Sequence, residues 1–221
     1  MIKVLFIGKK DDYYAELAAK RCKNKNIKLK ALFVNRNNKD IFNNINWEGE
    51  YIISYLCPLL IPSNILKKAK ILALNFHPGP PEYPGIGCTN YAIYNEDSNY
   101  GATCHIMSEK IDDGEILEVK RFKIRKNENL YSLTMNTYKN MYGLYLKILG
   151  KIIDEKEFKI SKKSSWKGEP KTRKEFLSFL KLSTNMSNSE IKKRIFSTTY
   201  PGFEPAQFNI KGIKFFGNIN E

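Results

Sequence analysis

The chain has 221 residues, which at the usual size of roughly 100–200 residues per domain allows one α/β domain with a smaller attached unit. Hydrophobic residues make up 42% of the chain and aromatic residues 13%, enough to supply a packed core, so disorder is not expected. The four cysteines lack CxxC spacing, which argues against a zinc site or a disulfide framework. No apolar stretch is long enough for a secretory signal or a membrane span, so we expect a cytoplasmic protein. No set of metal ligands stands out, so we expect no metal site.

The net charge of +14 raises the question of nucleic-acid binding. Lysine is spread evenly along the chain rather than gathered in one segment, and this favours a solvated basic surface. The alternative is a role in attracting anions such as a phosphate, a pyrophosphate or a polyglutamate tail. The charge alone therefore assigns no partner.

The first third of the chain alternates between apolar runs and amphipathic segments. The continuous apolar run of residues 2–8 predicts a buried parallel strand, and further strands are expected over residues 28–34, 51–56 and 71–76. Helices are expected over residues 13–23 and 64–69, the second capped by Ser63. Strands that alternate with helices imply βαβ units. We therefore expect an α/β fold with a Rossmann-like, mostly parallel sheet.

The pattern changes after these strands. Prolines and glycines exclude regular structure from residues 79–85. The sequence then predicts a short helix over 89–94, strands over 102–107 and 115–124, and a long helix that follows the cap Asn129 and ends near Ile153. These elements complete a domain of residues 1–158.

Residues 159–221 are expected to form a small C-terminal subdomain. The chain is polar and irregular from residue 159, and it then offers a helix over 189–196 and a β-hairpin over 208–216 with Lys211-Gly212 at the turn. The hairpin carries more apolar side chains than a two-stranded ribbon can shelter: Phe208, Ile210, Ile213, Phe215 and Phe216. We expect them to pack against the main domain or against a second copy in a homodimer.

Candidate catalytic residues follow the fourth predicted strand. Asn75 and His77 share one face, because residues two apart on a strand point the same way. Side chains at the carboxyl end of such a strand face the crevice where ligands bind. An amide donor beside an imidazole suits acyl transfer, since one group steadies an oxyanion and the other relays a proton. A capping asparagine and a core histidine are the structural alternative.

Two further segments carry polar residues of interest. His105 lies in an alternating strand, where a half-buried structural role and a role in ligand binding are both open. Asp112 and Asp113 precede Gly114 in a turn, where aspartate is common for local reasons. Taken alone, this second segment predicts only a turn.

In combination, these segments resemble the folate-dependent formyltransferase family. The order is Asn-x-His at a strand end, a Pro/Gly loop, a Gly-x-Thr-x-His strand and Ile-Asp-x-Gly. The resemblance covers residues 1–150 and is most specific over 75–117. The segment NFHPGPPEYPG at 75–85 is similar to that of sugar-nucleotide N-formyltransferases, whereas the purine and tRNA enzymes have Ser-Leu-Leu-Pro.

The resemblance implies an enzyme that transfers a formyl group from N10-formyltetrahydrofolate to the amine of a nucleotide-linked amino sugar, most often a dTDP-4-amino-4,6-dideoxyhexose. Such enzymes serve O-antigen or lipopolysaccharide biosynthesis. By motif position, Asn75, His77 and Asp112 would form the catalytic triad. Backbone groups of two segments would hold the pterin of the folate: Cys57, Pro58, Leu59 and Leu60, and Lys110 and Ile111.

Residues on the acceptor side leave weaker signals. Lys9 and Lys10 follow the first strand, where exposed amides and positive charge suit a pyrophosphate, although solvated lysines would look the same. The prolines around Tyr83 fix its direction and make it a candidate wall of the sugar pocket. Tyr200 begins a Tyr-Pro-Gly segment and either approaches the acceptor or belongs to a plain turn.

Two other functions stay open on the sequence alone. One is a different folate enzyme on the same fold, acting on tRNA, a ribonucleotide or water as a deformylating hydrolase. The other is a basic nucleic-acid-binding module, which is disfavoured because the aromatic residues follow core-like patterns without an RNA-binding signature.

Overall fold

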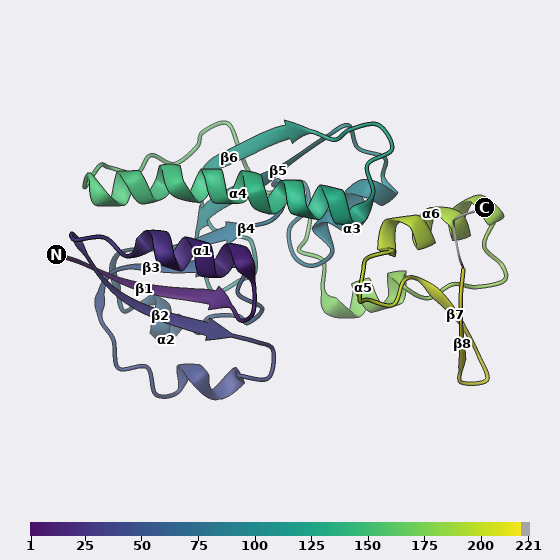
Figure 1. Ribbon diagram of the computed structural model, residues 1–221, viewed down its shortest axis with the longest axis horizontal. Helices are drawn as coiled ribbons and strands as arrows, with labels where there is room; N and C mark the ends of the chain where they lie inside the picture. Colours follow the sequence, from purple (N-terminus) through teal and green to yellow (C-terminus); the bar gives the residue numbers. More distant parts are fainter. Residues whose placement is uncertain (218–221) are drawn as a thin grey trace.

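The computed structural model describes residues 1–217, which contain a six-stranded sheet of order β2-β1-β3-β4-β5-β6 (Figure 1). The strands are β1 (Ile2–Lys9), β2 (Ile27–Val34), β3 (Gly49–Tyr55), β4 (Ala69–His77), β5 (Asn99–Ile106) and β6 (Ile116–Lys123). Pairs among β1 to β4 are parallel, whereas β4 with β5 and β5 with β6 are antiparallel. The predicted α/β class and the mostly parallel, Rossmann-like sheet are confirmed.

The helices of this domain are α1 (Tyr13–Cys22), the 3-10 helix η1 (Lys39–Phe42), α2 (Ser63–Leu66), α3 (Cys88–Tyr94) and α4 (Leu130–Ile153). Asn129 caps α4 as predicted, accepting a hydrogen bond from the backbone N–H of Ser132. The expected cap at Ser63 is wrong. Pro62, in an extended conformation, occupies the cap position, and Ser63 is the first residue of a helix that ends at Leu66. No helix within residues 1–217 has the length and apolar character needed to cross a membrane.

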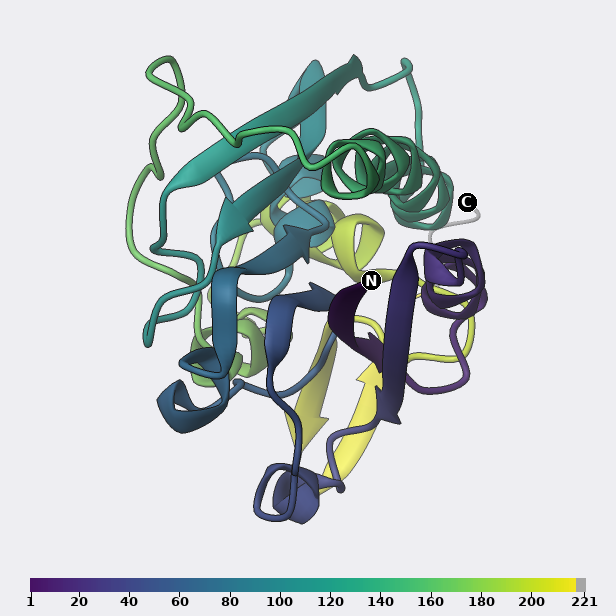
Figure 2. The same cartoon turned by 90° about the vertical axis from the view of Figure 1, so that its left-hand side faces the viewer.

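Both faces of the sheet are covered (Figure 2). Helices α1 and α4 pack on one face, while η1 and α2 lie on the other. Successive residues of β1 point to opposite layers: Val4 and Phe6 belong to the α1/α4 core, and Leu5 and Ile7 to the core beneath η1 and α2. Burial on two faces explains why this strand reads as a continuous apolar run.

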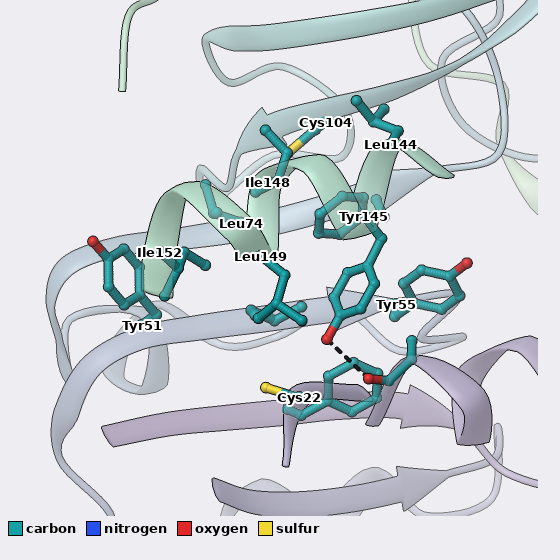
Figure 3. Packing of buried hydrophobic residues seen from close by; sticks show 14 of the residues in the cluster. Cys22, Tyr51, Tyr55, Leu74, Cys104, Leu144, Tyr145, Ile148, Leu149 and Ile152 are labelled. Atoms are coloured by element: carbon teal, nitrogen blue, oxygen red, sulfur yellow. Dashed lines mark hydrogen bonds between the residues drawn. The ribbon is translucent and has the colours of Figure 1, made fainter. Parts of the chain in front are cut away.

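Helix α4 supplies the apolar stripe that fixes the first of these layers (Figure 3). Tyr145, Ile148 and Ile152 recur three or four residues apart, and each is at most 1% exposed. The hydroxyl of Tyr145 donates a hydrogen bond of 2.9 Å to the backbone carbonyl of Ala18, which ties α4 to α1. Full burial of each such side chain contributes about 1.5–3 kcal/mol, so this layer is a rigid support for the strands.

The C-terminal segment contains α5 (Arg173–Phe179), α6 (Asn188–Thr198) and an antiparallel hairpin of β7 (Gln207–Ile210) and β8 (Ile213–Phe216). It lies beyond the carboxyl ends of β1 and β2 (Figure 1). Helix α5 was not expected in this polar stretch; a capping box between Thr172 and Glu175 starts it. The predicted hairpin turn is confirmed, with positive φ at both Lys211 and Gly212.

Of the five apolar side chains of the hairpin that we expected to be buried, only one packs against other residues of the described chain. Phe208 packs against the small cluster around Leu182, Ile195 and Ala206. The other four, Ile210, Ile213, Phe215 and Phe216, are each about half exposed or more. Within the described residues, the main domain therefore does not cover these four side chains.

Candidate active site

Two of the sequence motifs meet because β4 and β5 are neighbouring antiparallel strands. Asn75 and His77 lie at the carboxyl end of β4, on one face of the sheet. The register places His105 of β5 opposite Asn75, and the amide Nδ2 of Asn75 lies 3.0 Å from Nε2 of His105. The sheet thus carries an amide and two imidazoles in one group.

Asp112 joins this group from the turn between β5 and β6. Its Oδ2 lies 3.1 Å from Nδ1 of His77, and its Oδ1 lies 3.3 Å from Nε2 of His105. Oδ2 also accepts a 2.8 Å hydrogen bond from the backbone N–H of Gly85. The backbone of Asp112 has φ +43°, in the left-handed region that aspartate tolerates better than most residues. One buried carboxylate therefore connects β4, β5 and the Pro/Gly loop.

The surroundings of His77 favour its charged form. Its Nδ1 faces the Asp112 carboxylate, and its Nε2 lies 2.8 Å from the backbone carbonyl oxygen of Tyr83. Burial alone would lower the pKa of His77, but the charge of Asp112 and the hydrogen bonds raise it above its ordinary value. Burial would raise the pKa of Asp112, but the charge of His77 and the contacts with His105 lower it. Both shifts favour the charged form of each group, and the two side chains attract each other within the buried site.

The structure brings His105, whose role the sequence left open, into direct contact with this pair. The side chain is almost fully buried, and Nδ1–H donates a 2.9 Å hydrogen bond to the backbone carbonyl of Ile106. Nε2 is then the atom that faces both Asn75 and Asp112. His105 therefore lies within contact distance of both Asn75 and Asp112.

A cavity of about 290 Å³ opens beside the triad. Asn75, His77, His105 and Asp112 all line it. The same cavity is lined by every residue expected to hold the pterin, namely Cys57, Pro58, Leu59, Leu60, Lys110 and Ile111. Within residues 1–217, no three His, Cys, Asp or Glu side chains are grouped as metal ligands would be. The walls are mainly apolar, as suits a flat heterocycle recognised by backbone groups.

Lys9 and Lys10 lie outside the lining of this cavity. The ammonium group of Lys9 is 3.2 Å from Oδ2 of Asp12, whose other oxygen caps α1. The N-terminus of α1 thus already has a carboxylate, which lowers its attraction for a further anion. Lys10 is exposed and has no ion-pair partner in the described part of the chain.

The side chains of Tyr83 and Tyr200 also lie outside the cavity lining. The Tyr83 hydroxyl donates a hydrogen bond to Asp97, so its ring points away from His77 while its carbonyl oxygen contacts that residue. The ring of Tyr200 packs 5.6 Å from that of Tyr131, measured between centroids. Both tyrosines contact one apolar cluster beside α3 and α4.

Three residues that the sequence did not single out belong to the same region. Ser54 of β3, buried and paired in register with Asn75, lines the cavity, as does Arg36 after β2. The indole of Trp166 lies 5.6 Å from the His77 ring and 5.0 Å from the His105 ring, between centroids. The periodicity of the sequence does not indicate a role for Trp166. The one feature that could have singled it out is a large aromatic side chain within a polar segment.

An amide, two imidazoles and a carboxylate lie together beside an apolar cavity at the carboxyl end of a Rossmann-like sheet. Such an arrangement suits acid–base chemistry at a carbonyl group. Residues 3–149 of the chain match the family described as formyl transferase. The chain belongs to this family.

Two characterised relatives match parts of the chain. It is 35% identical over 89 residues to the GDP-perosamine N-formyltransferase of Brucella melitensis, a match that covers 40% of this chain and 34% of the relative. It is 31% identical over 109 residues to the methionyl-tRNA formyltransferase of Ehrlichia ruminantium, covering 49% and 35%. The chain therefore matches about a third of the length of each relative.

Solved structures share the fold over nearly the whole chain. A 4-N formyltransferase from Francisella tularensis aligns with a TM-score of 0.81 at 17% identity, covering 99% of this chain and 97% of that one. An N-formyltransferase from Helicobacter canadensis, in complex with folinic acid and dTDP-3-aminofucose, aligns with a TM-score of 0.69 at 20% identity, covering 97% and 86%. At these identities, the similarity establishes the fold.

Proposed function

We propose that this protein transfers the formyl group of N10-formyltetrahydrofolate to the amine of a nucleotide-linked amino sugar, of the dTDP-4-amino-4,6-dideoxyhexose type. The observation that carries the proposal is the junction of Asn75, His77 and Asp112 with a cavity lined by both expected pterin segments. A formyl group carried by a folate in that cavity would lie beside the triad. The relative that acts on GDP-perosamine, and the neighbour bound to folinic acid and dTDP-3-aminofucose, support the same donor and acceptor classes.

The chemistry follows from the hydrogen-bonding capacity of each group. The unprotonated acceptor amine attacks the formyl carbon and forms a tetrahedral oxyanion. The Asn75 amide and the charged His77 ring are the donors that stabilise this oxyanion. The new bond joins the acceptor nitrogen to the formyl carbon, the bond from that carbon to N10 breaks, and N10 takes up the proton that the acceptor nitrogen gives up.

Asp112 keeps the His77 ring oriented during these steps. His77 can offer its Nε2 proton only when the contact with the Tyr83 carbonyl breaks, because that atom is already engaged. The contact of Nδ1 with Asp112 can persist meanwhile, so the ring remains charged and in place. We infer that binding of the substrate exchanges the Tyr83 carbonyl for a substrate oxygen.

On the acceptor side we propose Lys9, Lys10, Tyr83 and Tyr200, with Lys10 as the main contact for a pyrophosphate. Asp12 neutralises Lys9, whereas Lys10 is exposed and follows the same strand. Tyr83 would act through its carbonyl oxygen on His77 rather than through its hydroxyl. Tyr200 lies in the aromatic cluster that includes Tyr131, where a nucleobase could stack.

The decisive assay combines the purified chain with N10-formyltetrahydrofolate and a panel of dTDP- and GDP-linked amino sugars, and follows the mass of each acceptor. A formyl gain on an amino sugar supports the proposal. Charged methionyl-tRNA belongs in the same panel, because the chain is also similar to methionyl-tRNA formyltransferase. Formylation of the tRNA alone would overturn the sugar assignment. Release of formate without any acceptor would identify a hydrolase.

We also propose that the protein is a homodimer that self-associates through the β7–β8 hairpin. Four apolar side chains of this hairpin are about half exposed or more. A two-stranded ribbon in water is only marginally stable by itself, and leaving these side chains in water does not stabilise it. A second copy would bury them by a symmetric contact, the usual form of self-association in soluble proteins.

A further inference from the structure

A segment of the C-terminal part of the chain, residues 161–171, passes across the loop and turn that carry the triad. We call it the strap. Its first residue, Ser161, donates a backbone hydrogen bond of 2.8 Å to the carbonyl of Ile116 in β6. Lys167 donates one of 2.9 Å to Pro81, and Lys171 one of 3.0 Å to Pro84. The strap is thus bonded to both walls of the site, the Asp112 side and the Pro/Gly loop.

The last of these contacts reaches Asp112 through one residue. Lys171 and Gly85 form a parallel β-bridge, and a Cβ atom at Gly85 would lie 2.4 Å from the Lys171 carbonyl oxygen. The N–H of the same glycine donates to the Asp112 carboxylate. Only glycine at position 85 allows the strap to pair with this backbone while its N–H binds the Asp112 carboxylate, because any side chain would collide with Lys171.

Trp166 is the side chain that the strap directs at the reacting groups. Its ring is nearly perpendicular to those of His77 and His105, with interplanar angles of 77° and 89°. Its Nε1–H donates a 2.7 Å hydrogen bond to the carbonyl of Gly114, two residues beyond Asp112. One indole therefore contacts both imidazoles and also holds the turn that carries the carboxylate.

We propose that Trp166 is a positioning residue for formyl transfer, which holds the two histidine rings and the Asp112 turn in one arrangement and keeps water from their outer side. The inference rests on the proposed function, because it takes His77 and Asp112 as the groups that act on the substrate. Trp166 itself does not line the cavity, so it has no direct contact with a donor bound there. It should therefore affect turnover more than donor binding.

The chain has a second tryptophan, Trp47, which packs in the other core layer and provides a matched control. For Trp166→Ala we expect kcat to fall about 10²-fold with little change in the donor KM, since small displacements of catalytic groups have effects of this size. Trp166→Phe keeps an aromatic ring but loses the bond to Gly114, and it should retain more activity. Trp47→Phe should keep wild-type kcat. A kcat of wild-type size in Trp166→Ala would overturn the proposal.

The pH dependence of kcat in Trp166→Ala distinguishes a positioning role of Trp166 from a role in fold stability alone. The titratable groups that face His77 are Asp112 from the turn and Cys88 from α3, with His105 across the carboxylate. Without the indole, water reaches the His77–Asp112 pair and weakens it, so the alkaline limb of kcat should move to lower pH. If Trp166→Ala lowers the folded fraction but leaves this limb in place, its role is structural and the proposal fails.

A fluorescence titration tests the contact without any substrate. In Trp47→Phe the remaining indole is Trp166, and a charged imidazole quenches indole emission. We expect emission to rise with pH as His77 loses its proton, and the transition to disappear in the double variant that adds His77→Gln. A pH-independent emission, or a pH transition that His77→Gln leaves unchanged, would overturn the proposal even if the enzyme forms formylated sugars. Should Trp166→Ala fail to fold, this titration together with Trp166→Phe decides the question.

Discussion

At the scale of single residues, the site depends on one carboxylate with three partners. Asp112 contacts His77, His105 and the N–H of Gly85, and it is buried, whereas the adjacent Asp113 is exposed. Two neighbouring aspartates of the same turn thus have opposite environments. This difference provides a matched pair for mutagenesis.

Asp112→Asn should reduce kcat by about 10²–10⁴-fold, as removal of an acid–base partner usually does, and His77→Asn should reduce it by a similar factor. Asparagine also tolerates the left-handed backbone of position 112, so the fold should persist. Asp113→Asn should change kcat by less than about threefold, because its exposed side chain lies outside the cavity lining. Equal losses at the two aspartates in steady-state assays would show that the motif is misplaced by one residue.

The His77–Asp112 pair also makes stability depend on pH. The raised pKa of His77 stabilises the fold fully below the ordinary histidine value of about 6.5, and this contribution is lost as the pH rises through the raised pKa. The lowered pKa of Asp112 stabilises the fold above the ordinary aspartate value of about 4, and this contribution is lost as the pH falls through the lowered pKa. Both contributions are complete between those two ordinary values.

Urea unfolding of wild type and Asp112→Asn should therefore differ most between about pH 4 and pH 6.5, by about 3 kcal/mol in the free energy of unfolding. The difference should shrink on either side of that window. Asp113→Asn, measured in parallel, should show no such window. A difference that is constant from pH 4 to pH 9 would mean that Asp112 does not form an ion pair with His77.

Lys9, the last residue of β1, and Lys10, which follows it, also differ in their surroundings: Lys9 pairs with Asp12, whereas Lys10 is exposed. Lys10→Ala should raise the KM for the sugar nucleotide about tenfold, because one charged contact to a phosphate contributes roughly 1.5 kcal/mol or more. Lys9→Ala should have a smaller effect, since Asp12 already neutralises that side chain. Steady-state kinetics at varied acceptor concentration will show which of the two substitutions raises the KM more. Unchanged KM values in both variants would place the pyrophosphate elsewhere.

At the scale of elements, the turn between β5 and β6 carries Asp112 and packs closely against Ile106, the last residue of β5. A Cβ atom at Gly114 would lie 1.8 Å from the carbonyl oxygen of Ile106, so the backbone of the turn can come this close only with glycine. Gly150, near the end of α4, has no atom within 4 Å of such a Cβ position. The packing of the turn that carries Asp112 thus requires the glycine of the Asp-x-Gly motif.

Gly114→Ala should displace the turn and lower both kcat and stability, the latter by about 1–3 kcal/mol, as overpacking commonly does. Gly150→Ala should instead stabilise the protein by about 0.5–1 kcal/mol, because alanine favours a helix and meets open space there. Thermal unfolding and steady-state assays of both variants check the opposite signs. Full activity in Gly114→Ala would show that the turn tolerates displacement.

At the scale of the whole molecule, the main domain and the C-terminal segment differ in how completely they bury their apolar residues. Both faces of the six-stranded sheet are covered, whereas the hairpin leaves four large apolar side chains about half exposed or more (Figures 1 and 2). Helix α6 fastens the segment to the main domain, where the Asn90 amide donates a 2.9 Å hydrogen bond to the carbonyl of Ser197. These exposed side chains are the surface at which we propose that a second copy binds.

The double substitution Phe215→Ser and Phe216→Ser should convert a dimer into a monomer, because it removes two of the large apolar side chains of the proposed contact. Light scattering at micromolar concentration measures the mass directly. The exchange Tyr13→Ser, at an exposed aromatic residue of α1, serves as a control that should remain dimeric. A monomeric wild-type protein would overturn the homodimer.

Several features of the protein follow from the sequence alone because they depend on local patterns. The continuous apolar run of residues 2–8 identified a strand buried on two faces, and Asn129 identified the start of α4. The resemblance to the formyltransferase family selected Asn75, His77 and Asp112, and the structure brings these three together at a cavity. The residues expected to hold the pterin line that cavity as well.

The tertiary structure decided what depends on the path of the backbone between distant segments. The antiparallel register of β5 brings His105 between Asn75 and Asp112, and the strap directs Trp166 at both histidines. Neither contact has a local signature, because a strand histidine and an isolated tryptophan look the same in the sequence wherever the chain takes them. The pairing of Lys9 with Asp12 likewise shows only in the folded chain. Residue patterns report burial and backbone preference, whereas contacts across the sheet depend on strand order, register and the route of the connections.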